Sequence, residues 1–169
     1  LSLGQLFRNG VQEGLLAASY RINALEAYTI SAKVAQNIQA KHLISFAKGY
    51  LGELYEDESK LEDALTYTRQ ALFISQALAD DTLLYRWQWQ IARIQKKMGK
   101  LDASLMHYRQ SVATLNRSRT SMTLGSGINF QKSVGPVFYE FADLLLKQAS
   151  QLNDKTAEQS MLQEVIDVL

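Results

Sequence analysis

The chain has 169 residues, with no cysteine, one proline and nine glycines. Without cysteine it can form no disulfide, thiol nucleophile, thiolate zinc site or iron–sulfur cluster. A net charge of +1 gives no general attraction for nucleic acid or for an anionic membrane. Because helix-breaking residues are rare, we expect long helices, and no apolar run approaches the ~20 residues that a membrane span needs.

The two ends of the chain suggest a fragment of a longer protein. Residues 1–9 have neither the basic start nor the apolar core of a signal peptide. At the other end, Leu162, Val165, Ile166 and Leu169 continue an apolar helical stripe to the last position. We expect this stripe to dock on a following C-terminal part. The compartment stays open, with the cytoplasm favoured.

A shift of about 40 residues aligns the chain with itself, which is the signature of an internal repeat. Leucine recurs at Leu25, Leu65 and Leu105. Small residues recur at Ala24, Ala64 and Ser104, and again at Ser31, Ala71 and Ser111. Small side chains at a crossing point let two antiparallel helices approach to about 8 Å. The period therefore predicts helix hairpins that stack on one another.

Apolar residues at helical spacing divide the chain into four helix pairs. The expected pairs are 5–18 with 21–38, 41–56 with 60–79, 82–98 with 101–117, and 133–150 with 155–169. Ser59 and Glu62 predict a capping box, Asp81 is expected to cap the following helix, and Gly99 is expected to end it. We expect residues 1–169 to form one all-α domain, a right-handed solenoid of antiparallel hairpins over 5–38, 41–79, 82–117 and 133–169.

Residues 118–132 interrupt the helical pattern. A connection of this length is uncommon in a compact domain, and Gly125 and Gly127 permit turns. We expect either a mobile insertion or a flap over a groove with Phe130 as its anchor. Pro136 is expected in the first turn of the last hairpin, where its missing N–H costs nothing.

Three short motifs carry a resemblance to the tetratricopeptide repeat. They are Leu51-Gly52-x-x-Tyr55, Ala64-Leu65-x-Tyr67 and Ala71-Leu72. The chain departs from that family in its period, which is about 40 residues rather than about 34. It also lacks, at 76–80, the proline that commonly closes the repeat. The resemblance implies a solenoid whose first helices line a concave groove for a protein or peptide.

A narrower resemblance covers residues 40–169. The runs 85–90, 129–130 and 133–139 are similar to the repeat region that precedes a CHAT domain in bacterial, notably cyanobacterial, proteins. In that family the CHAT domain is a caspase-like cysteine peptidase. The resemblance implies that this chain is the sensing or regulatory part of such a protein, and that the His/Cys dyad lies outside it.

Charged residues mark the candidate ligand surface. One face of the helix expected at 82–98 presents four bases and a tryptophan opposite its core stripe: Arg86, Trp89, Arg93, Lys96 and Lys97. The helix expected at 41–56 and the turn after it present the acidic side chains of Glu53, Glu56 and Asp57. Trp87 is expected in the core. Trp89 is expected to line the groove or to pack under arginine side chains.

The shift that reveals the repeat also pairs these charges. It places Glu53 against Arg93, Glu56 against Lys96, and Asp57 against Lys97. One interpretation is that the two helices pair with each other, each exposed pair being worth about 0–1 kcal/mol. The other is a groove of two signs that binds a peptide of complementary charge.

No arrangement of residues indicates an enzyme, a cofactor or a metal. His42 and His107 lie far apart in the sequence without carboxylates at ligand spacing, and Glu140 and Asp143 are expected to be a solvated pair. We predict a module that binds a protein or peptide, its own C-terminal domain included. The alternative is a spacer or dimerisation domain without a ligand groove. Nucleic acid is disfavoured because the neighbouring helix is acidic.

Overall fold

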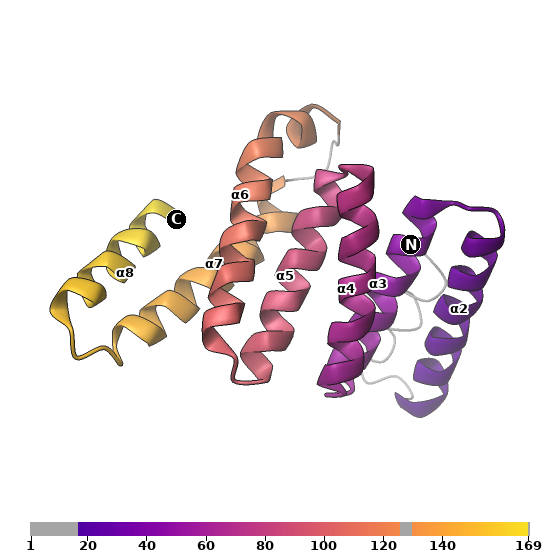
Figure 1. Ribbon diagram of the computed structural model, residues 1–169, viewed down its shortest axis with the longest axis horizontal. Helices are drawn as coiled ribbons and strands as arrows, with labels where there is room; N and C mark the ends of the chain where they lie inside the picture. Colours follow the sequence, from indigo (N-terminus) through magenta and orange to yellow (C-terminus); the bar gives the residue numbers. More distant parts are fainter. Residues whose placement is uncertain (1–16, 126–129, 169) are drawn as a thin grey trace.

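In the computed structural model the described residues, 17–125 and 130–168, form seven helices and no strand (Figure 1). The helices are α2 (Ala17–Asn37), α3 (Lys41–Asp57), α4 (Leu61–Leu78), α5 (Asp81–Lys97), α6 (Leu101–Gly125), α7 (Phe130–Ala149) and α8 (Lys155–Val168). The expectation of an all-helical fold is confirmed for this part of the chain.

Each helix packs on the next one along the chain, and α3 also packs on α5. Figure 1 shows the result as a row of helices with α2 at one end and α8 at the other. The largest core cluster joins α5, α6, α7 and α8. Trp87 of α5 is fully buried against α3 and α4, as the sequence predicts. Helix α5 is therefore the central packing element of the row.

Glycines on α3 allow this close packing. A Cβ added at Gly49 would overlap the ring of Trp87, and one added at Gly52 would overlap the hydroxyl of Thr68 on α4. The close approach of α3 to α4 and α5 therefore depends on small residues at these two positions.

Helices α2 to α5 end in the same C-terminal motif. The residues just after them, Gln39, Ser59, Ala79 and Gly99, have positive φ angles of 53°, 59°, 51° and 74°. In each case the next N–H donates to the carbonyl five residues earlier, at 2.9–3.3 Å. The positive-φ residue itself donates three residues back, which completes a Schellman motif. The same short turn thus ends each consecutive helix from α2 to α5, and the prediction for Gly99 is confirmed.

Two predicted helix caps are wrong by one residue. Ser59 does not begin a capping box, because it is the left-handed residue that ends α3, and the residue after it takes the N-cap position of α4 without a side-chain bond. Asp80, rather than Asp81, caps α5. Its Oδ1 accepts from the backbone N–H groups of Thr82 at 3.0 Å and Leu83 at 3.3 Å.

The first predicted hairpin differs from the structure. Its expected break at 18–21 is wrong, because α2 is helical from Ala17 to Asn37. No glycine or proline lies within that segment to stop the helix. The remainder of the first predicted helix, 5–16, lies outside the described residues. The later helices at 41–79 and 82–98 agree with the structure to within about two residues, the usual uncertainty of helix ends.

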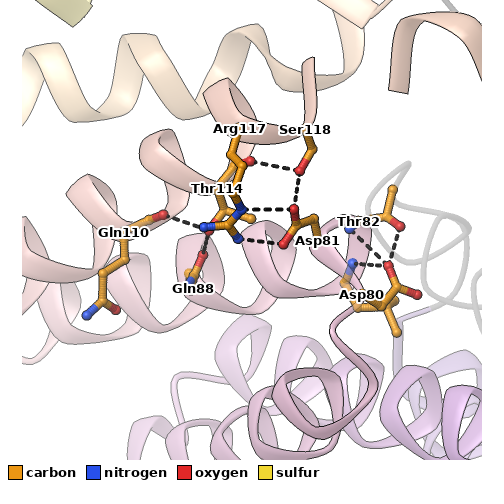
Figure 2. A network of polar contacts seen from close by, with 9 residues as sticks. Asp80, Asp81, Thr82, Gln88, Gln110, Thr114, Arg117 and Ser118 are labelled. Carbon is orange, nitrogen blue, oxygen red and sulfur yellow. Dashed lines mark hydrogen bonds and ion pairs between the residues drawn. The ribbon is translucent and has the colours of Figure 1, made fainter. Parts of the chain in front are cut away.

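The long connection predicted at 118–132 is mostly helical. Helix α6 continues to Gly125 and α7 begins at Phe130, so residues 126–129 alone are left undescribed between them. Contacts with α5 help to explain the extension of α6. Figure 2 shows the carboxylate of Asp81 accepting from the Nε of Arg117, at 3.1 Å, and from the hydroxyl of Ser118. The idea of a flap anchored by the Phe130 side chain lies outside the described side chains.

Pro136 lies inside α7, past the first turn in which the sequence predicts it. It is exposed there, where the proline ring removes one helical N–H. The α7–α8 hairpin itself matches the pair predicted at 133–150 and 155–169.

Candidate interaction surface

Trp89 lies where α5 meets α7. The guanidinium of Arg93 sits 4.5 Å from the centre of its ring, and its indole Nε1 donates to Glu140 Oε2 at 2.7 Å. The sequence prediction that Trp89 packs under an arginine is thus met. The hydrogen bond to Glu140 fixes the ring between α5 and α7, so Trp89 forms one side of the predicted interaction surface.

Glu56 is the centre of the charged part of the surface. Its side chain is only 4% exposed and accepts two bonds from Arg93, at 3.2 Å from Nε and 3.1 Å from Nη2. Lys97 Nζ lies 3.0 Å from its Oε1. Burial alone would raise the pKa of Glu56, but Arg93 and Lys97 outweigh it and hold that pKa below its usual range. The cluster is a hydrogen-bonded ion triad around one nearly buried carboxylate.

The predicted pairing of the charges has the wrong register. Glu56, and not Glu53, binds Arg93, and it also binds Lys97. Lys96 instead reaches Asp143 of α7 at 3.2 Å. The two bases that bind Glu56 are one turn apart on α5, so both side chains can converge on one carboxylate of α3. The interpretation in which the helices pair with each other therefore holds for Glu56, Arg93 and Lys97.

Asp57, the remaining acidic residue of the prediction, is exposed at the end of α3. Glu53 instead borders a pocket of about 200 Å³ between α3 and α5. Arg86 and Arg93 border the same pocket. The structure therefore brings together most of the predicted surface residues, but much of their charge is paired within the molecule.

The carboxylates of α7 are not the solvated pair that the sequence predicted. Glu140 Oε2 accepts from Trp89 and, at 3.0 Å, from the hydroxyl of Tyr108 on α6. Burial and the neighbouring Glu140 raise the pKa of the Tyr108 hydroxyl, which remains a donor. Asp143 is partly exposed and holds both Lys96 and Lys147. The chain of contacts thus extends from α3 across α5 and α6 to α7.

Arg86 differs from the other bases of the surface. Its Nη1 donates to the Tyr50 hydroxyl at 2.8 Å, and its guanidinium lies about 6 Å from the rings of Tyr50 and Trp87. Within the described part of the chain no carboxylate pairs with it. Among the described side chains, aromatic groups rather than a carboxylate hold this guanidinium.

An apolar pocket of about 490 Å³ lies between α2 and α3, where the sequence predicted no site. Its walls include Tyr28, Ile30, Val34, Leu43, Phe46 and Tyr50. Ile30, Val34 and Leu43 are each more than half exposed. A signal was present in the apolar residues at 30, 34 and 38, which recur every turn of the helix predicted at 21–38, but helical spacing alone does not show that they stay exposed.

The two histidines have structural contacts. His42 Nδ1 lies 3.3 Å from Asp80 Oδ2, and His107 Nδ1 lies 2.9 Å from the Ala103 carbonyl. Burial lowers the pKa of His107. In the part of the chain that the structure describes, no three metal-binding side chains come together and no helix is long and apolar enough to cross a membrane.

Neither a scan of the chain against protein-family models nor a search of curated proteins finds a match. Membership of a family therefore stays a prediction from the sequence motifs.

Proposed function

We propose that this chain is a helical-repeat module of the tetratricopeptide kind that binds a protein or peptide segment. The positions of the helices support a repeat. Helices α3 to α6 begin at Lys41, Leu61, Asp81 and Leu101, so the step from α3 to α5 equals the step from α4 to α6. Stacked hairpins of this kind form a solenoid, which leaves an extended face for a partner.

The apolar pocket between α2 and α3 is the observation that carries the binding function. Its volume of about 490 Å³ lies within the range of roughly 300–1,000 Å³ that ligand pockets have. Stacked rings form one wall, since the centres of Tyr28 and Tyr50 lie 5.4 Å apart. Exposed apolar side chains that gather at a pocket mark an interaction site more often than scattered ones do.

The charged residues have a different role in this proposal. Because Glu56 already binds Arg93 and Lys97, these groups hold α3 against α5 and offer little charge to a partner. They stiffen the helix that carries Phe46 and Tyr50, so the pocket wall is formed before a ligand arrives. Preformed walls lower the ordering cost of binding.

The test uses a random library of twelve-residue peptides displayed against the full chain. We expect peptides selected by the wild type to lose at least tenfold in affinity for Val34→Asp, because a buried carboxylate would oppose an apolar ligand. Phe73→Asp is the matched control, since Phe73 is 73% exposed on α4, away from the pocket. Titration calorimetry of one selected peptide measures both variants.

Failure of the selection, or equal binding to Val34→Asp and Phe73→Asp, would contradict a ligand site between α2 and α3. The alternative is then a spacer or dimerisation domain, which the exposed apolar residues of α8 favour. Ile166 is 68% exposed and Leu162 is 38% exposed. Light scattering that finds a dimer, lost in Ile166→Asp, would support that alternative.

The resemblance to regions that precede CHAT domains extends the proposal. The partner would then include a caspase-like domain of the same protein, which the repeats sense or restrain. The reading frame after Leu169 tests this part directly. A His followed by a Cys in a caspase-like α/β pattern would support it, and any other domain would contradict it.

A further inference from the structure

Tyr50 lines two different pockets, which therefore lie next to each other. It lines the apolar pocket between α2 and α3 and also the smaller pocket between α3 and α5. The first is walled by aromatic and aliphatic side chains, and the second by Glu53, Arg86 and Arg93. A ligand that extends past Tyr50 therefore leaves an apolar site and enters a charged one.

Of the arginines that line the second pocket, Arg86 is the one that pairs with no carboxylate among the described residues. Arg93, Arg109 and Arg117 each donate two bonds to one carboxylate. Arg86 instead donates to the neutral hydroxyl of Tyr50. A guanidinium has five N–H donors, and the bond to Tyr50 uses one of them. Most of its donors therefore have no partner among the described side chains. The rings of Tyr50 and Trp87, each about 6 Å away, help to hold the guanidinium in place.

The charge around Arg86 selects the anion. The charged residues that line this pocket, Glu53, Arg86 and Arg93, together carry one net positive charge. One carboxylate would neutralise it, whereas a phosphate group would bring close to two negative charges beside Glu53. A planar carboxylate also matches the guanidinium fork.

We propose that the peptide bound by this module carries an apolar side chain for the pocket between α2 and α3, with an Asp or Glu close by in sequence that pairs with Arg86. The inference rests on the function proposed above. It adds the acidic residue, its position next to the apolar anchor, and the side chain that recognises it.

The experiment repeats the peptide selection with three full-length proteins: wild type, Arg86→Gln and Arg109→Gln. Arg109→Gln is the matched control, because it removes the same charge from an exposed pair with Glu164. We expect wild type and Arg109→Gln to enrich peptides with an acid beside the apolar residue. Arg86→Gln should keep the apolar preference and lose the acidic one.

Binding of one selected peptide and of its Glu→Gln form then measures the contact. The acidic form should bind the wild type roughly tenfold more tightly, and the difference should vanish in Arg86→Gln. Thermal melts show whether each variant folds. If Arg86→Gln does not fold, the contact is measured on the wild type through the NMR signal of the Arg86 Nε–H group. The chemical shift of this signal should change on addition of the acidic peptide and not on addition of its Glu→Gln form.

Outcomes separate the two proposals. Apolar peptides without an acid preference, or a preference that survives Arg86→Gln, would overturn the role of Arg86 and leave the binding module intact. No enrichment of any peptide would overturn both. If Leu6→Ser with Phe7→Ser in the full chain raises the affinity for every peptide equally, the pocket serves the chain's own N-terminal segment, and the inference is overturned.

Discussion

At the scale of single residues, the helix ends carry an unusual cost. Three of the four left-handed residues that follow helices α2 to α5 are not glycine: Gln39, Ser59 and Ala79. A Cβ in this conformation costs roughly 1 kcal/mol or more. The turns are retained because each Schellman motif satisfies carbonyls that the helix would otherwise leave without partners. The chain thus accepts local strain in order to keep its turns short.

Substitutions at two equivalent turns test this strain. Ala79→Gly should stabilise the fold by about 0.5–1 kcal/mol, and Gly99→Ala should destabilise it by about 1 kcal/mol. A Cβ at Gly99 would meet no atom within 4 Å, so its effect comes from the backbone alone. Urea unfolding followed by circular dichroism measures both. Shifts of the same sign would contradict the assigned turn geometry.

At the scale of helices, the contact between α3 and α5 depends on one carboxylate. Removing one partner of a buried ion pair costs about 3–5 kcal/mol, because the other charges lose their counterion. Glu56 is nearly buried and holds both Arg93 and Lys97. Helix α5 therefore depends on Glu56 for its position as well as on the packing of Trp87.

Glu56→Gln should lower the free energy of unfolding at neutral pH by about 3 kcal/mol. Because the folded-state pKa of Glu56 is lowered, its stabilising effect is present above the unfolded pKa, near 4.5, and is lost as pH falls through the lower folded value. The variant should therefore lose less stability than the wild type below about pH 4.5. Glu26→Gln, exposed on α2, is the control. If the free energy of unfolding falls equally with pH in the wild type and in Glu56→Gln, the ion pairs of Glu56 with Arg93 and Lys97 would be contradicted.

Helix patterns were predictable because they depend on local spacing. The helices of residues 41–98 and the burial of Trp87 follow from apolar periodicity and small residues. The caps failed by one residue, since Ser59 is a good N-cap by type but the turn needs a left-handed residue there. The ion pairs failed because a repeat gives equivalent positions and not the offset between packed helices. Arg93 binds Glu56 rather than Glu53, and Lys97 binds Glu56 rather than Asp57. The pocket was not predicted because helical spacing does not show which apolar residues stay exposed between two packed helices.

At the scale of the whole molecule, one face divides into parts with different roles. Ion pairs and hydrogen bonds tie α3, α5, α6 and α7 together through Glu56 and Glu140. Beside them, the pocket between α2 and α3 keeps apolar side chains exposed. Arg86 lies between these two parts. We interpret the ion-paired region of α3, α5, α6 and α7 as the structural support, and the pocket between α2 and α3 as the binding site.

Amide NMR of the full chain, titrated with a peptide selected on it, tests the binding site most directly. We expect the largest shifts on α2 around Val34, on α3 around Phe46 and Tyr50, and at the side chain of Arg86, with small changes on α7 and α8. Shifts concentrated on α7 and α8, or none at saturating peptide, would contradict the claim that the pocket between α2 and α3 is the site of a peptide-binding module.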